Sequence, residues 1–82
     1  MSFKEIKIKY FAALKEQAGR AQESIETEAK TAREVFQEMK EKYGFKLDLC
    51  HTRLALNDEF RDFDALIEDG DEVVFIPPVA GG

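Results

Sequence analysis

The sequence contains little cysteine and no long apolar stretch. Cys50 is the only cysteine among 82 residues, so no disulfide can form within the chain. We therefore expect a cytoplasmic protein whose fold is stabilised by its hydrophobic core alone. No apolar stretch approaches the roughly 20 residues that a membrane-spanning helix needs. The first ten residues alternate charged and apolar side chains, which is not the pattern of a signal peptide. We therefore expect a cytoplasmic location and no membrane partner.

Basic residues are also fewer than acidic ones. The chain has 17 acidic and 12 basic residues and a net charge of -5, which opposes binding to nucleic acid. Eight of the acidic residues lie between Asn57 and Glu72, where only Arg61 opposes them. We interpret this acidic run as a solvated face. The alternative is an acidic rim that steers a basic partner towards a nearby C-terminus.

The residues that usually carry catalysis or metal binding are sparse. Cys50 and His51 are adjacent, but neighbours on an extended segment point in opposite directions, and no third group is indicated to orient them. Neither a second cysteine nor a second histidine is available for a zinc site. Asp69-Gly70-Asp71 is predicted to be a turn, because the spaced ligands of a calcium loop are missing. We expect no bound metal or cofactor and no stand-alone enzyme.

The length suits one small domain, and its patterns predict a mixture of helices and strands. Ile6, Ile8 and Tyr10 alternate with polar residues and are expected to face the core. Thr31 and Glu34 fit a capping box at the start of the main helix, which Gly44 should end. The predicted strands are 5–10, 23–28, 53–56 and 72–76, with a turn at 57–58 that leads into Glu59 and Phe60. The predicted helices are 12–18 and 32–43. This is an α+β sheet with one main helix packed on one face.

The last seven residues are Ile76, Pro77, Pro78, Val79, Ala80, Gly81 and Gly82. Glycine has no Cβ, so the walls of a partner's active site can approach such a tail closely. Two prolines stiffen its root. A free carboxylate reacts with nucleophiles only after activation, for example as a mixed anhydride with a nucleotide phosphate. We therefore predict a domain at 1–76 and an extended tail at 77–82 that presents its terminal carboxylate. An inert or truncated end is the alternative.

Several motifs along the chain resemble those of the small subunits of molybdopterin synthase, the sulfur carriers of molybdenum cofactor biosynthesis. The matching pieces are Tyr10 to Glu16 with Gly19, then Leu56-Asn57-Asp58, then Asp69 to Val73, and finally Ile76 to Gly82. They are spread over nearly the whole chain. Ala80 stands where many members of the family carry serine or threonine, and the position requires only a small residue.

The resemblance implies a β-grasp, ubiquitin-like fold and a role as a sulfur carrier. An ATP-dependent enzyme of the ubiquitin-activating type would adenylate the Gly82 carboxylate, which is then converted to a thiocarboxylate. The tail, with Pro78, Val79, Ala80 and Gly81, would insert into the large synthase subunit. There the sulfur would pass to cyclic pyranopterin monophosphate to form the molybdopterin dithiolene. The chain itself would bind no ATP, and the family suggests a heterotetrameric synthase.

Strand parity supplies a possible docking surface for these partners. If Val73 and Phe75 face the core, Ile76 lies on the open face of the last strand. Phe11 falls on the same side, and Phe60 follows a turn beside the acidic run. We predict that Phe11, Phe60 and Ile76 form an apolar docking cluster near the root of the tail, with ordinary core packing as the alternative.

Other functions stay open on the residues alone. A β-grasp sulfur carrier for thiazole synthesis or tRNA thiolation would share the Gly81-Gly82 ending. The segment from Phe11 to Gly19 and the ending from Pro77 to Gly82 favour the molybdopterin branch. A ubiquitin-like protein modifier would join Gly82 to lysine amines of its targets. A plain interaction domain would have an inert terminus.

Overall fold

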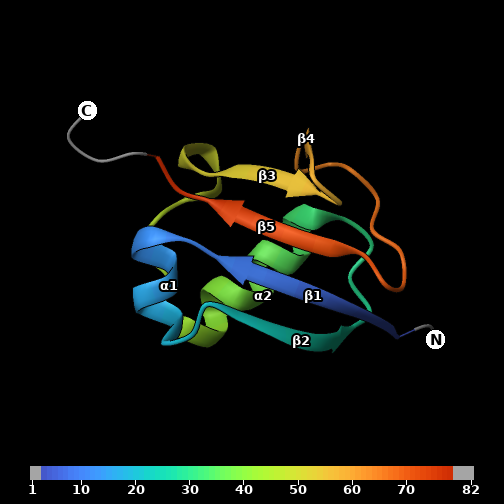
Figure 1. Ribbon diagram of the computed structural model, residues 1–82, viewed down its shortest axis with the longest axis horizontal. Coiled ribbons are helices and arrows are strands. Elements are labelled where there is room, and N and C mark those ends of the chain that lie inside the picture. Colours follow the sequence, from blue (N-terminus) through green and yellow to red (C-terminus); the bar gives the residue numbers. More distant parts are fainter. Residues whose placement is uncertain (1–2, 79–82) are drawn as a thin grey trace.

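The structure is a computed structural model that describes residues 3–78 (Figure 1). One mixed sheet of five strands runs through the molecule, with two helices and one short 3-10 turn. In chain order the elements are β1 (Lys4–Tyr10), α1 (Ala12–Ala18), β2 (Gln22–Thr27), α2 (Ala32–Tyr43), η1 (Leu49–His51), β3 (Arg53–Leu56), β4 (Glu59–Arg61) and β5 (Glu72–Ile76).

The sheet has the strand order β2-β1-β5-β3-β4. Its two central strands, β1 and β5, are parallel, with Tyr10 opposite Phe75. The other neighbours are antiparallel, and Ile76 lies opposite Arg53 of β3. Because β1 and β5 run in the same direction, the end of β1 and the end of β5 lie at one end of the molecule, and the starts of both strands lie towards the other (Figure 1). This mixed sheet is the β-grasp arrangement that the resemblance implies.

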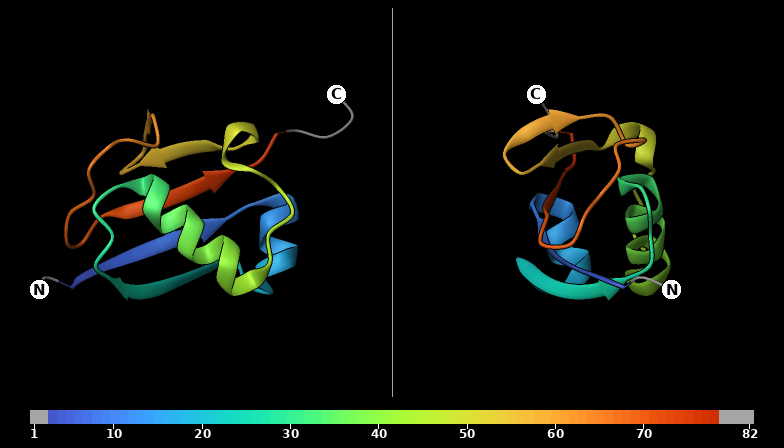
Figure 2. Two further views of the ribbon diagram at one scale, coloured as in Figure 1. Left: turned by 180° about the vertical axis from the view of Figure 1, so that it is seen from behind. Right: turned by 90° about the vertical axis from the view of Figure 1, so that its right-hand side faces the viewer.

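One face of the sheet is covered by α2, while α1 lies at the end where the tail begins (Figure 2). Alternate strand residues point at α2, as the period of two requires. Phe36 of α2 packs edge-on against Phe75, with ring centroids 5.2 Å apart. The aromatic part of the core is completed by Tyr10, Phe45 and Phe63. Within residues 3–78 the other face of the sheet carries no helix.

Most of the local predictions are confirmed. Ile6, Ile8 and Tyr10 are buried, and α2 begins at a capped Thr31, whose Oγ1 accepts a hydrogen bond from the Glu34 amide at 3.3 Å. The Glu34 carboxylate accepts from the amide of Lys30, at 2.7 Å, one residue before the cap. Gly44 ends the helix with φ of 69°, the left-handed conformation that glycine adopts without strain.

Two local expectations were wrong. The sequence from Phe63 to Ile67 predicts three apolar anchors for an irregular connection, namely Phe63, Leu66 and Ile67. Phe63 and Ile67 are buried, but Leu66 is 70% exposed, while Ala65 is buried. The backbone of Leu66 forms an isolated antiparallel bridge with Thr31. Cys50 and His51 lie in the turn η1 and are both exposed, so the segment is not extended. Neither difference was visible in the local pattern, because loop residues follow no fixed period.

Candidate docking site at the root of the tail

The root of the tail emerges from the middle of the sheet. β5 lies between β1 and β3 and ends at Ile76, after which come Pro77 and Pro78. Proline has no amide hydrogen to continue the ladder. Pro77 is buried and Pro78 is exposed, so the chain leaves the sheet over this short distance. The predicted tail residues Val79, Ala80, Gly81 and Gly82 lie outside the described residues.

An apolar hollow of about 610 Å³ lies beside this root. Glu16 is the one charged residue in its lining. The remaining lining residues are Phe11, Ala12, Ala13, Leu47, Ile76, Pro77 and Pro78. They come from the end of β1, from α1, from the loop after α2 and from the end of β5. An open apolar hollow on a small charged domain is a typical place for a partner to bind. Of the predicted docking residues, the structure brings Phe11, Ile76 and Pro78 together here.

Phe11 owes its exposure to an unusual turn. Ala12 has φ of 51°, in the left-handed region that residues with a Cβ seldom adopt. The chain therefore reverses abruptly between β1 and α1, and the Phe11 carbonyl accepts from the Leu14 amide at 3.1 Å. The Phe11 side chain is left 49% exposed. Strain of this kind is often found at functional sites, and no sequence signal revealed Ala12 as the source of it.

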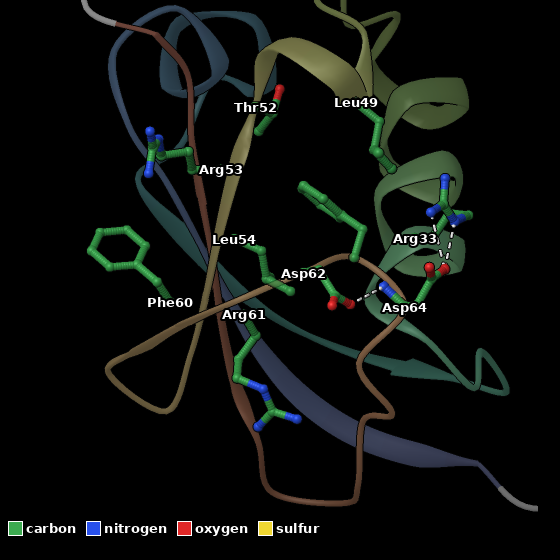
Figure 3. A pocket seen from close by; sticks show the side chains of 10 residues that line it. Arg33, Leu49, Thr52, Arg53, Leu54, Phe60, Arg61, Asp62 and Asp64 are labelled. Carbon is green, nitrogen blue, oxygen red and sulfur yellow. Dashed lines mark hydrogen bonds and ion pairs between the residues drawn. The ribbon is translucent and has the colours of Figure 1, made fainter.

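The prediction that Phe60 belongs to a cluster at the tail root was wrong. Phe60 is 69% exposed and lies on the open face, but two strands away from β5. In the register it is opposite Ala55, which in turn is opposite Val74. It lines a separate hollow with Arg53 and Arg61, and Figure 3 shows its ring on the same side of β3 as Arg53. Strand pairing, which sets this separation, could not be read from spacing along the chain.

The acidic run lies towards the end of the molecule opposite the tail, which argues against the alternative interpretation of it as an acidic rim near the C-terminus. Its last residue, Glu72, begins β5, whereas the tail leaves the other end of that strand. The turn at Asn57 is tied to the same distant end, because its side chain donates to Asp71 and accepts from the Glu72 amide, both at 2.9 Å. The carboxylates of this run therefore do not surround the tail root.

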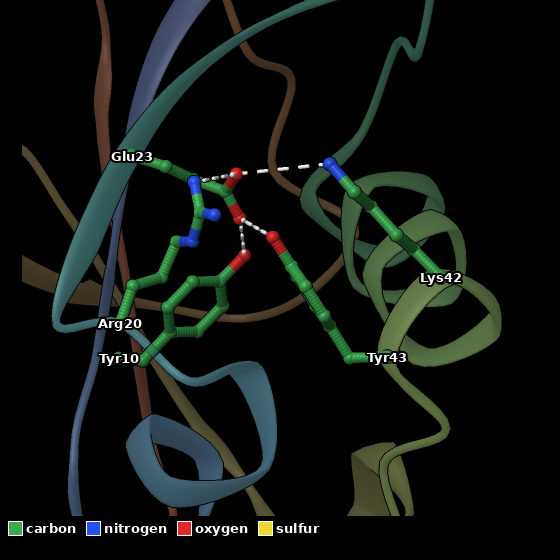
Figure 4. Close-up of polar contacts among 5 residues, drawn as sticks. All are labelled: Tyr10, Arg20, Glu23, Lys42 and Tyr43. Atoms are coloured by element: carbon green, nitrogen blue, oxygen red, sulfur yellow. Dashed lines mark hydrogen bonds and ion pairs between the residues drawn. The ribbon is translucent and has the colours of Figure 1, made fainter.

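A polar cluster links Tyr10 of β1, Glu23 of β2 and Tyr43 of α2 (Figure 4). The hydroxyls of Tyr10 and Tyr43 each donate to Oε2 of Glu23 at 2.6 Å. Arg20 and Lys42 approach the other carboxylate oxygen at 3.5 and 3.7 Å. Tyr10 precedes Phe11 and packs on Phe75, the residue before Ile76. The cluster thus joins β1, β2 and α2, and Tyr10 connects it to Phe75 of β5.

The pKa values in this cluster follow from the contacts. Burial by itself raises the pKa of Glu23, but the hydrogen bonds from Tyr10 and Tyr43 and the charges of Lys42 and Arg20 outweigh it, so the pKa lies below its ordinary value. Burial and the hydrogen bond to Glu23 raise the pKa of both tyrosine hydroxyls. Glu23 is therefore ionised and both tyrosines are neutral donors near pH 7.

The described residues include no group of three or more His, Cys, Asp and Glu side chains that could hold a metal ion. Within the same part of the chain, no helix is long and apolar enough to cross a membrane. Cys50 and His51 line a smaller hollow on the β3 side of the tail root, together with Arg53, Ile76, Pro77 and Pro78.

Several known proteins are similar to this chain in both sequence and fold. The chain is 31% identical over 80 residues to the molybdopterin synthase sulfur carrier subunit of Escherichia coli (strain K12), covering 94% of this chain and 99% of that protein. A solved Pyrococcus furiosus protein, assigned as molybdopterin converting factor subunit 1, is 31% identical with a TM-score of 0.77. The match covers 93% of this chain and 99% of that one.

A third relative was solved together with its partner. In a Helicobacter pylori complex of subunits 1 and 2 of molybdopterin-converting factor, the matching chain is 30% identical, with a TM-score of 0.64, covering 95% of this chain and 99% of that one. The ThiS family model matches residues 8–82, which is nearly all of the sequence, including the predicted tail. This chain is a member of the ThiS family.

Proposed function

We propose that this chain is the sulfur carrier subunit of a molybdopterin synthase. The carboxylate of Gly82 attacks the α-phosphate of ATP on an activating enzyme, and pyrophosphate leaves. A sulfur nucleophile then displaces AMP from the acyl adenylate, which leaves a thiocarboxylate. In the large subunit this sulfur passes to cyclic pyranopterin monophosphate to build the dithiolene. The chain supplies the acyl group, and its partners supply the catalytic residues and the ATP site.

The observation that carries this proposal is the apolar hollow at the tail root. Phe11, Ile76 and Pro78 surround the point where the chain leaves the sheet, so a partner that binds them also receives the residues that follow. The domain then determines where the tail is delivered, and the tail determines the chemistry. The relatives named as sulfur carriers support this proposal.

The proposed partners are an adenylating enzyme of the ubiquitin-activating type and the large synthase subunit. The Helicobacter pylori complex of subunits 1 and 2 supports the second of these. Pro78, Val79, Ala80 and Gly81 are proposed to lie in the partner's tail channel, where small residues let the channel walls approach the backbone. Phe60 is proposed as an outer contact, because it is exposed on the same open face as Ile76.

Reconstitution tests the proposal. The chain is incubated with the activating enzyme, ATP and a sulfide source, and the intact mass is measured before the large subunit and cyclic pyranopterin monophosphate are added. We expect a mass gain equal to the difference between sulfur and oxygen, followed by dithiolene formation and return to the original mass. A variant lacking Gly82 should do neither, because its terminal carboxylate, now on Gly81, lies one residue, or roughly 3.5 Å of extended chain, short of the partner's reacting groups.

The controls separate the other functions. Phe3→Ala, at the opposite end of the molecule, should load and transfer sulfur like the wild type. Covalent attachment of the chain to lysines of other proteins would instead indicate a protein modifier. Sulfur loading without dithiolene formation, together with transfer to a thiazole precursor or to tRNA, would indicate another sulfur-carrier pathway. Absence of loading with an active enzyme mixture would refute the carrier function.

A further inference from the structure

The charged side chains are divided unequally between the two ends of the molecule. Residues 9–23 and 40–53, which form the end where the tail begins, hold seven basic and four acidic residues. The rest of the chain holds five basic and thirteen acidic residues. These two segments therefore have a net charge of +3 and the rest of the chain one of -8, although the whole chain is acidic. The overall composition predicts a negatively charged surface, whereas the surface around the tail root is positively charged.

The cations at the tail end are not all neutralised locally. Arg20 and Lys42 approach Glu23, and Lys40 pairs with Asp48. The three exposed cations that make no ion pair within the described residues, and that adjoin the docking residues, are Lys15, Lys46 and Arg53.

These three cations flank the hollow on different elements. Lys15 precedes Glu16 on α1, and Lys46 precedes Leu47, while both Glu16 and Leu47 line the hollow. Arg53 lies opposite Ile76 in the sheet and shares the smaller hollow with Pro77 and Pro78. Glu16 is the one carboxylate in the apolar lining. The docking residues thus form an apolar centre with a cationic rim, which is how protein interfaces are commonly built.

We propose that the large synthase subunit binds this surface through an apolar patch bordered by carboxylates, which pair with Lys15, Lys46 and Arg53. This inference rests on the proposed function and adds the chemistry of the partner's face. Opposite charges at an interface rim raise the association rate and fix the orientation more than they raise affinity. The large negative charge at the far end is repelled by the same carboxylates, so the chain approaches the partner with the tail first.

Charge reversal combined with stopped-flow kinetics tests the proposal. Association of the full chain with the large subunit is measured for Lys15→Glu, Lys46→Glu and Arg53→Glu at several salt concentrations. Lys30→Glu is the matched control, because it makes the same change in net charge on an exposed lysine at the opposite end. Thermal melts establish that each variant is folded, as expected for exposed side chains without ion pairs.

We expect each of the three reversals to slow association roughly 3- to 10-fold at low salt. At about 0.5 M salt most of this effect should disappear, because the ions screen interactions between exposed charges that are more than a few ångströms apart. Lys30→Glu should change the rate by less than about twofold. Equal slowing by Lys30→Glu, no slowing by any of the three, or faster association would overturn the inference.

The same measurements distinguish failure of the charged rim from failure of the proposed function. If the wild type binds the large subunit and Phe11→Ala weakens binding, while the three reversals have no effect, the charged rim is refuted and the carrier function stands. If the wild type does not bind the large subunit at all, both are refuted. A concentration-dependent dimer in sedimentation that the reversals abolish, with unchanged association to the large subunit, would show that the cations bind the acidic end of a second copy and would overturn the inference.

Discussion

Truncation of Phe11 to alanine should weaken binding of the large subunit without unfolding the chain. Phe11 is 49% exposed beside the tail root. A phenylalanine side chain has about 200 Å² of surface, so a partner that covers the exposed half removes roughly 100 Å² of apolar surface from water. At about 25 cal/mol per Å², this contributes ~2.5 kcal/mol to binding, or about a 60-fold change in Kd.

The covered half of the ring also contributes to the fold. Its loss should lower the free energy of unfolding by about 1–2 kcal/mol, which a small domain tolerates. The assay is isothermal titration calorimetry of the variant against the large subunit, below its melting temperature. Phe3→Ala is the matched control, because Phe3 is 60% exposed at the other end of the molecule. A change in Kd below about threefold for Phe11→Ala, or an equal change for Phe3→Ala, would refute the docking assignment.

Three further predictions concern the tail, the polar cluster and the strained turn. Deletion of Gly82 should abolish the sulfur-dependent mass gain and leave the thermal melt unchanged, and a loaded deletion variant would contradict the proposed chemistry. Because the pKa of Glu23 in the fold lies below its ordinary value of 4.5, its ionised form stabilises the fold above that pH, and this stability is lost as the pH falls through the folded pKa. Urea titrations from pH 7 to 3 should show a smaller loss of stability for Glu23→Gln than for the wild type, and equal losses would refute the assignment. Ala12→Val should lower the free energy of unfolding by about 1–2 kcal/mol, because a β-branched residue is poorly tolerated at φ of 51°, whereas Ala12→Gly should stay within about 1 kcal/mol in chemical denaturation.

Prediction from sequence succeeded where the residues within a single helix or strand determine its structure. The alternation of Ile6, Ile8 and Tyr10 identified the buried face of β1, because side chains on a strand alternate regardless of its neighbours. The cap at Thr31 and the stop at Gly44 bounded α2 for similarly local reasons. The apolar character of the tail root was also visible, since Ile76 and the two prolines are adjacent in sequence.

Prediction failed where two distant segments had to be placed relative to each other. Phe60 and Ile76 looked like members of one cluster, yet β3 lies between their strands. The acidic run is close to Ile76 in sequence, but the length of β5 separates them. The cluster around Glu23 was not predicted at all, because Tyr10, Glu23 and Tyr43 show no pattern until β1, β2 and α2 are packed together.

The sequence by itself determined most of the strands, the helices and the resemblance to sulfur carriers, and it supplied the proposal of a reactive terminus, since each depends on residues that are neighbours along the chain. Only the tertiary structure decided which side chains surround the tail root and what charge they present there. The parallel pairing of β1 with β5 places Phe11 beside Ile76 and leaves the acidic turns at the opposite end. An acidic chain can in this way offer its partner an apolar surface with a basic rim.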